Sequence, residues 1–281
     1  MTVEPRFHQM IYDARPWYHD FSSLGIQTHF REQTQERTIR GFLSDYSPRY
    51  LVDKFFSKPR HYLKKAYAAA LRREKLMKTI NVNGGNQQRK EKYILPYLEE
   101  AFLSCKSKGV EKPSTLELFC ADGYYSFWMQ RTYELQNLKA LDLNERRIKQ
   151  AKVMNSVLQS DIEFQYMDVY DLSPEERYDV TLCAGGLYHV HDPKRVLELC
   201  HTITRHYVVV QSVISLESED EDYFVTPAPG WKHGSRFSNA RLRKWIEEVG
   251  FEILEQGRDR LDNDAPLSSR GTAYYLCKKV E

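Results

Sequence analysis

Apolar runs of strand length alternate with segments of helical periodicity from about residue 90 onward. The apolar runs predict strands at 115–119, 138–142, 162–167, 178–184 and 207–214. Apolar positions at helical spacing predict the intervening helices, at 125–135, 145–158 and 193–203, and another helix through Ile94, Leu98, Ala101 and Phe102 before the first strand. Strands and helices that alternate in this way indicate right-handed crossovers and a parallel sheet. The pattern therefore predicts an α/β fold.

The alternation is interrupted between residues 216 and 237. This segment starts with the acidic run 217–222 and continues with aromatic residues and prolines, which predicts a long irregular loop. Ser238 is placed to cap a helix that ends at Gly250. Apolar runs at 251–256 and 272–278 predict two final strands that close the sheet.

The N-terminal part of the chain lacks this alternation. Residues 5–30 are rich in aromatic side chains without a sustained period, which predicts a partly helical arm that either packs on the core or covers a site. Two glycines between Asn83 and Asn86 predict a loop, and hence a boundary between an extension at 1–86 and a domain at 87–281.

Basic side chains predominate between the arm and this boundary. Leu63, Tyr67 and Leu71 recur at helical spacing, and the lysines and arginines around them, including Lys64 and Arg72, fall on other faces. This pattern predicts an amphipathic helix with a cationic outer side. Such a side is either a solvated surface or an electrostatic footprint for nucleic acid.

Composition narrows the class of protein. At 281 residues and 41% hydrophobic content, the chain has room for one α/β core and an appendage, and its net charge of +2 selects no partner. Five cysteines without a CxxC pair argue against a disulfide framework or a zinc site. No N-terminal apolar run is present, and the β-rich stretch 207–214 is too short to span a membrane. We therefore expect a cytoplasmic protein without a membrane partner.

The stretch 114–126 has the pattern of a ligand cradle. Leu116 and Leu118 alternate with polar residues in the first strand, a Cys-Ala-Asp-Gly turn follows, and Phe127 lies in the helix that comes next. A strand that enters a helix through small residues lets backbone N–H groups approach a ligand closely. The pattern is typical of nucleotide-type cofactors.

Three carboxylates fall on successive strands. Glu117 lies inside the first strand, Asp142 follows about twenty residues after Gly123 at the end of the second, and Asp168 ends the third. Each carboxylate could instead cap a helix or pair with a base, because an unpaired charge beside apolar strands is costly. Their order along the carboxyl edge of the sheet favours a cofactor site.

With these residues in place, the chain from about 90 to 281 resembles the class I S-adenosylmethionine (SAM) dependent methyltransferases. The resemblance implies a Rossmann-like seven-stranded sheet with an antiparallel last strand, a helical N-terminal extension, SAM as cofactor and S-adenosylhomocysteine (SAH) as product. It implies that the methionine end, ribose and adenine of SAM are held by Glu117, Cys120, Ala121, Gly123, Tyr124, Asp142, Leu143, Asp168, Val169 and Gly185. The family usually has glycine where this chain has Phe119 and Ala121.

A narrower resemblance rests on four motifs. Trp17-Tyr-His19, the stretch 118–126, Gly186-Leu-Tyr-His-Val-His-Asp-Pro193 and the stretch 231–238 are similar to the subgroup of the tRNA wobble-uridine (methoxyuridine) methyltransferase. That subgroup also contains enzymes that act on small molecules. The motifs therefore indicate the reaction better than the acceptor.

Histidines after the fourth strand are candidates for proton removal. His189 and His191 lie near the expected position of the transferred methyl group, and imidazole titrates near neutral pH. We expect catalytic roles for His189, Tyr188 and His233, and no metal, because no carboxylate–histidine pattern accompanies them. The residues expected to wall the pocket or form a lid are aromatic and suit a sulfonium cation: Trp17, Tyr18, His19, Tyr125 and Trp231.

Three functions fit these observations. The leading one is methyl transfer to a small molecule, of the kind found in specialised metabolism. The second is methylation of tRNA, which the basic N-terminal region favours and the acidic run 217–222 opposes. The third is a non-catalytic SAM-binding protein, for which Phe119 in the turn is the supporting feature. The methylated atom, the oligomeric state and the choice between SAM and a carboxylated SAM are left open.

Overall fold

The computed structural model describes residues 5–28, 85–229, 232–261 and 270–280, and the chain divides into two compact units, 1–85 and 86–281. In the first unit, helix α1 (Pro5–Asp13) is followed by the short 3₁₀ helix η1 (Ser22–Leu24). The Trp17 indole donates to the carbonyl of Ile11 at 2.9 Å, and its ring meets that of Phe21 edge-on. The predicted cationic helix, with Lys64 and Arg72, lies outside the described residues.

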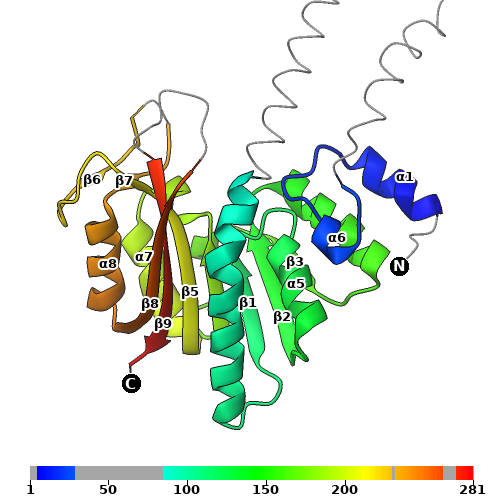
Figure 1. The fold of residues 1–281 in the computed structure, drawn as a ribbon, viewed down its shortest axis with the longest axis horizontal. Helices are drawn as coiled ribbons and strands as arrows, with labels where there is room; N and C mark the ends of the chain where they lie inside the picture. The colour runs from blue at the N-terminus through cyan, green and yellow to red at the C-terminus, as the bar shows by residue number, and fades with distance from the viewer. Residues whose placement is uncertain (1–4, 29–84, 230–231, 262–269, 281) are drawn as a thin grey trace, which may run out of the picture. The chain divides into compact units, whose positions relative to one another are not determined.

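The second unit is built on a seven-stranded sheet with the order β3-β2-β1-β4-β5-β9-β8. The first five strands of the chain pair in parallel, and β9 runs antiparallel to both β5 and β8. The strands are β1 (Ser114–Leu118), β2 (Asn137–Asp142), β3 (Glu163–Tyr166), β4 (Tyr178–Ala184), β5 (Thr204–Ser215), β8 (Phe251–Arg260) and β9 (Arg270–Lys279). The predicted Rossmann-like sheet with an antiparallel last strand is confirmed (Figure 1).

Helices lie between the strands as the periodicity predicts. They are the helix of residues 85–107, α5 (Tyr124–Thr132), α6 (Glu145–Leu158), α7 (Pro193–Ile203) and α8 (Asn239–Glu248). The last three begin at a side-chain cap: Asn144, Asp192 and Ser238 each accept a hydrogen bond from the backbone N–H three residues later. Such a cap provides an acceptor for a backbone N–H group in the first turn, which has no partner within the helix.

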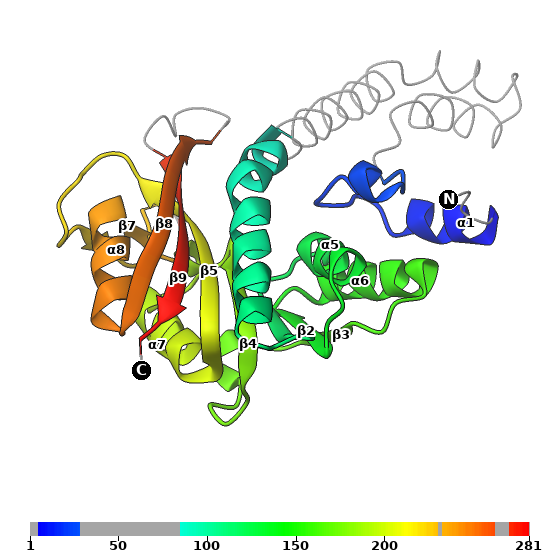
Figure 2. The same cartoon turned by 60° about the horizontal axis from the view of Figure 1, so that its bottom comes forward.

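Helices cover both faces of the sheet (Figures 1 and 2). On one face, the Tyr93 ring of the 85–107 helix stacks on Tyr274 of β9, with centroids 4.4 Å apart. On the other face, Val208 and Val210 of β5 share a core with side chains of α7 and α8. Every residue of β1 and β4 is buried, as expected for central parallel strands.

The segment between β5 and α8 is more ordered than the predicted loop. It contains a two-stranded ladder of β6 (Phe224–Val225) and β7 (Arg236–Phe237). The rings of Phe224 and Phe237 meet Trp245 of α8 edge-on, with centroids 5.2 and 5.3 Å apart. The acidic and aromatic composition of the segment predicts a loop. Its order could not be predicted locally, because the aromatic contacts depend on helix α8, which comes later in the chain.

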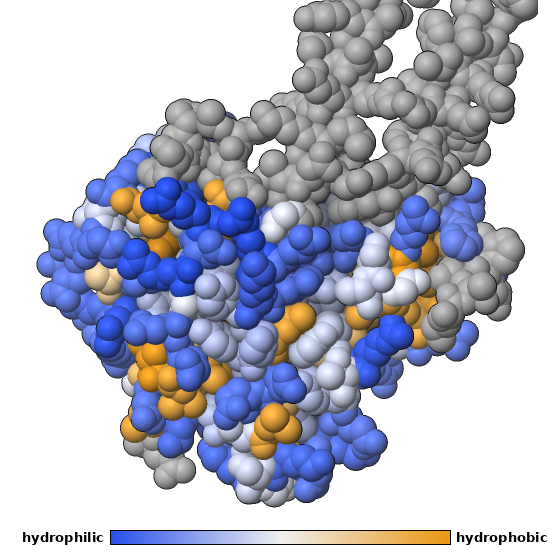
Figure 3. Space-filling model, viewed as in Figure 1, coloured by the Kyte–Doolittle hydropathy of each residue, from blue (hydrophilic) through white to orange (hydrophobic). Residues whose placement is uncertain are grey.

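The surface seen in Figure 3 carries apolar side chains in separate patches between hydrophilic ones. Among the described residues, no helix combines the length and apolar character needed to cross a membrane.

A buried carboxylate joins three strands at the amino edge of the sheet, opposite the predicted site. Asp179 of β4 accepts hydrogen bonds from the backbone N–H and the hydroxyl of Ser114 in β1, each at 2.8 Å. The guanidinium of Arg205 in β5 lies 3.3 Å from the same carboxylate. These bonds compensate the burial of the charge and hold the starts of β1, β4 and β5 in register.

We expect Asp179→Ala to lower the free energy of unfolding by about 2–3 kcal/mol, because it leaves the buried Ser114 N–H without an acceptor. Asp179→Asn keeps an acceptor oxygen and should cost less. Urea unfolding of the two variants measures the difference. An alanine variant as stable as the wild type would contradict this role.

Candidate functional site

The carboxyl ends of β1, β2 and β4 meet at one edge, where β1 turns into α5. Leu118 pairs with Leu141 of β2 and Cys183 of β4. The turn needs left-handed backbone at Phe119 (φ 61°), Ala121 (φ 49°) and Gly123 (φ 82°). A left-handed residue other than glycine costs about 1–2 kcal/mol. The chain thus keeps the conformation of a glycine-rich turn with a glycine at one of these three positions.

The Phe119 side chain leaves the turn and covers Gly186, after the end of β4. A Cβ atom on Gly186 would lie 1.8 Å from Cγ of Phe119, so the ring rests directly on the glycine Cα. The ring is half-buried and packs against the core under α7 and α8. The backbone of Gly186 has φ −116°, a value that any residue can adopt. Glycine is therefore required here by the Phe119 ring and not by the backbone conformation.

Glu117 is a buried carboxyl group near the end of β1. Its side chain is 2% exposed and accepts a hydrogen bond from the Ser126 hydroxyl of α5. Burial raises the pKa of Glu117 to about 8, although the Ser126 bonds oppose this, and the carboxylates of Asp122 and Asp142 raise it further. Glu117 is therefore mostly protonated at neutral pH until a cation binds beside it.

The other two carboxylates are oriented by backbone N–H groups. Asp142 accepts from Ala121 at 2.9 Å and from Asn144 at 2.7 Å, while burial raises its pKa. Asp168 accepts from the N–H of Tyr170 at 3.1 Å and caps the 3₁₀ helix η2 (Val169–Asp171). Each carboxylate oxygen has a second lone pair that can accept a hydroxyl or an amino group.

These residues fit SAM. The buried acid Glu117 suits the positively charged methionine end, and the fixed oxygens of Asp142 suit the ribose hydroxyls. Leu143 is 59% exposed directly after Asp142 and offers an apolar surface. At Gly123, an added Cβ would lie 2.6 Å from the Phe164 ring, so the turn stays narrow. Cys120 and Val169 are buried beside this edge.

A polar subsite lies at Gly185, directly after β4. The position of a Cβ on Gly185 is 3.9 Å from Oε1 of Gln211 in β5 and 4.0 Å from Nζ of Lys90 in the 85–107 helix. Lys90 is 9% exposed and Gln211 is 0% exposed. Neither residue is among those that the sequence motifs predict for the site. A glutamine within the apolar run Tyr207–Ile214 is the signal that could have found the subsite.

His189 lies beside this subsite, in the 3₁₀ helix η3 (Leu187–His189). Its ring meets that of Tyr188, with centroids 4.0 Å apart. The side chain keeps exposed surface, while desolvation by surrounding atoms and the charges of Lys90 and Arg270 lower the pKa of His189 to about 4. His189 is therefore neutral at pH 7, and its predicted role as a proton acceptor stays a prediction.

The remaining predicted pocket residues are dispersed. His233 is exposed, in a segment held beside η3 by the bond from the Ser235 N–H to the Tyr188 carbonyl at 3.0 Å. Tyr124 and Tyr125 are buried at the start of α5 and pack on each other.

The predicted lid residues stay a prediction. The rings of Tyr18 and His19 meet edge-on in the first unit, where Trp17 also lies, and Trp231 lies outside the described residues. Among the described residues, no group of three or more His, Cys, Asp or Glu side chains is placed to hold a metal ion.

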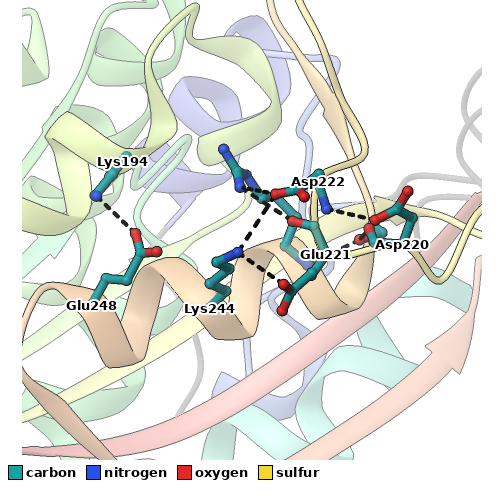
Figure 4. Close-up of polar contacts among 8 residues, drawn as sticks. Lys194, Asp220, Glu221, Asp222, Lys244 and Glu248 are labelled. Carbon is teal, nitrogen blue, oxygen red and sulfur yellow. Dashed lines mark hydrogen bonds and ion pairs between the residues drawn. The ribbon is translucent and has the colours of Figure 1, made fainter.

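The acidic run 217–222 is paired with basic side chains of its own chain. Figure 4 shows the Lys244 ammonium of α8 between Glu221 and Asp222, at 2.9 and 3.5 Å. The other pairs are Glu217 with Arg236, Glu219 with Arg258, and Asp222 with Arg241. Exposed pairs of this kind contribute about 0–1 kcal/mol each, and they offset part of the negative charge of the run. The run therefore opposes a polyanion less strongly than its composition alone predicts.

Gly186→Ala should lower the free energy of unfolding by about 1–3 kcal/mol, because the new methyl group meets the Phe119 ring. Phe119→Ala removes the obstacle, so adding Gly186→Ala to that variant should cost little. A double-mutant cycle in chemical denaturation measures this coupling. Additive effects of the two substitutions would show that the ring does not determine the glycine.

Comparisons with known proteins agree with this geometry. The family model described as "Methyltransferase domain" matches residues 67–256. Among solved structures, the N-terminal domain of EvdMO1 with SAH bound has a TM-score of 0.51 at 20% identity, covering 65% of this chain and 78% of that one. The magnesium protoporphyrin IX methyltransferase from Synechocystis PCC 6803 with bound SAH has a TM-score of 0.51 at 14% identity, covering 72% and 86%. At these identities the structures show the shared fold.

Curated relatives carry the name tRNA U34 carboxymethyltransferase. The one from Campylobacter jejuni (strain 81-176) is 25% identical over 167 residues, which is 58% of this chain and 54% of the relative. The one from Sulfurimonas denitrificans is 27% identical over 164 residues, 54% of each chain. The chain thus spans about half the length of the curated relatives it matches. Because the family model covers more than half of the sequence, the chain belongs to the methyltransferase domain family, with the fold of the class I enzymes that use S-adenosylmethionine.

Proposed function

We propose that the chain transfers a methyl group from SAM to a small polar acceptor bound at Gly185, where β4 ends beside β5. The observation that carries this proposal is the convergence of two buried polar groups, the Lys90 ammonium and the Gln211 amide oxygen, on the space at Gly185. Enclosed groups of this kind fix the orientation of a small ligand.

The chain's residues have a limited chemical task. SAM supplies a methyl group on a sulfonium that is already a good leaving group. Glu117 and Asp142 bind and orient this donor, and the subsite at Gly185 holds the acceptor in line with the methyl group. The Lys90 ammonium favours the ionised form of an acceptor hydroxyl, and neutral His189 can take up the proton that the acceptor loses as its bond to the methyl group forms and the methyl–sulfur bond breaks.

SAM affinity should rise with pH between 6 and 8.5. The cation favours ionised Glu117, whose pKa is about 8 in the free protein, so binding must release a proton at lower pH. Well below that pKa, each pH unit should change the dissociation constant by up to about tenfold. Calorimetry across this range measures the slope. A flat profile for the wild type would show that Glu117 does not face the cation.

Glu117→Gln is the matched control, because it removes the titration and keeps the shape. Its SAM affinity should be lower and independent of pH. In the absence of ligand, the raised pKa means that the folded state binds the extra proton, so wild-type stability should fall as pH rises from 4.5 to 8. The Gln variant should lack that contribution to the fall.

A second candidate function is carboxymethyl transfer to the wobble uridine of tRNA. The names of the relatives motivate it, and the observation that favours it is Lys90. The Lys90 side chain is 9% exposed, and Lys90 and Arg270 both act as positive charges on His189. A carboxylate on the donor would compensate the buried charge of Lys90.

Mass spectrometry of ligands carried through purification distinguishes the two functions. We expect SAM or SAH, and binding of tRNA that is weak at physiological salt. A copurified carboxylated donor, together with a tRNA complex whose affinity falls by about 0.7–0.9 log units per contact per decade of salt, would establish the second function instead. Lys90→Met is the control variant: it should spare SAM binding and weaken binding of a carboxylated donor.

A further inference from the structure

We infer that Gln211 determines acceptor specificity: its amide oxygen accepts a hydrogen bond from an O–H or N–H group of the acceptor at Gly185. This inference rests on the proposed function, because it assigns the acceptor to the subsite next to β4. It limits the acceptor class to molecules that present a hydrogen donor there, such as alcohols and amines.

The orientation of the Gln211 amide follows from its neighbours. The Gln211 Nε2 group donates to Oγ1 of Thr272 in β9 at 2.8 Å, and that hydroxyl donates to the carbonyl of Ser212 at 3.2 Å. A hydroxyl has one hydrogen. Because the Thr272 hydrogen is used on Ser212, Thr272 can only accept from Gln211, so the amide turns its NH₂ toward Thr272 and its oxygen toward Gly185.

The amide oxygen then lacks a partner. Oε1 of Gln211 is buried and has no hydrogen bond among the described residues. Buried carbonyl oxygens are rarely left in this state, since an unsatisfied one costs about 1–3 kcal/mol. Its position 3.9 Å from the Cβ site of Gly185 directs it at the space after β4, where the proposed function places the acceptor.

Lys90 sharpens the chemistry of the group that fits. An ammonium only donates and an amide oxygen only accepts. A hydroxyl can do both at once: it accepts from Lys90 and donates to Gln211. A methyl ether accepts but cannot donate, so methylation of the hydroxyl removes the bond to Gln211. Gln211 therefore favours binding of the unmethylated acceptor over binding of the O-methylated product.

Glycolate and methoxyacetate form a matched probe pair. Both carry a carboxylate, but the hydroxyl of glycolate is a methyl ether in methoxyacetate. Dissociation constants for the full chain saturated with SAH are measured by NMR titration. We expect glycolate to bind about tenfold more tightly, the effect of one hydrogen bond to an otherwise unsatisfied oxygen. Equal constants, or no binding of either probe, would overturn the inference.

Variants separate the role of Gln211 from that of the fold. Gln211→Met should reduce the ratio of the two constants to near one with SAH affinity retained. Thr272→Val frees the amide to rotate and should also reduce the ratio. Thr202→Val removes an exposed hydroxyl on α7 that bonds only its own helix, and should leave the ratio unchanged. A full ratio in Gln211→Met would assign the preference to another residue.

Different results would contradict the proposed function and the role of Gln211. Copurification of a carboxylated donor would overturn the proposed function and leave the probe ratio as it is. Equal probe constants in a chain that binds SAM and turns over a small acceptor would overturn only the role of Gln211.

Discussion

The left-handed turn after β1 is the constraint on which the candidate site depends. It directs the N–H of Ala121 to Asp142, which ties the ends of β1 and β2 together at the cofactor edge. It also sends the Phe119 ring over Gly186 and so determines how the chain leaves β4. One backbone conformation thus positions groups from three strands, although two of its left-handed residues carry side chains.

Ionisable side chains give the two halves of the site different character, acidic at the ends of β1 and β2 and basic at the end of β4. Glu117 and Asp142 place two carboxyl groups at the ends of β1 and β2, where burial raises both pKa values and a bound cation would favour the ionised forms. Lys90 and Arg270 bring positive charge toward His189, at the end of β4. This separation within one edge of a sheet is suited to a cationic donor and an acceptor that is ionised before it attacks the methyl group. The low pKa of His189 is a consequence of the same arrangement.

Most of the fold could be predicted from periodicity, because each strand and helix buries an apolar set that the sequence displays locally. The bounds of α6 and α7 agree with the prediction, and so do the strand positions. The three carboxylates could be selected as candidates because strand ends recur at regular intervals, and their cofactor contacts stay a prediction. Lys90 and Gln211 could not be selected because their burial arises from packing: Lys90 lies in a basic segment that predicts a surface, and Gln211 lies within a strand that predicts a core.

The contact between Phe119 and Gly186 has a consequence for redesign of this edge. With Phe119 present, a Cβ at position 186 has no room, so the two positions cannot be changed independently. A side chain introduced at 186 requires a smaller residue at 119. Any attempt to reshape the end of β4 therefore has to begin in the turn after β1.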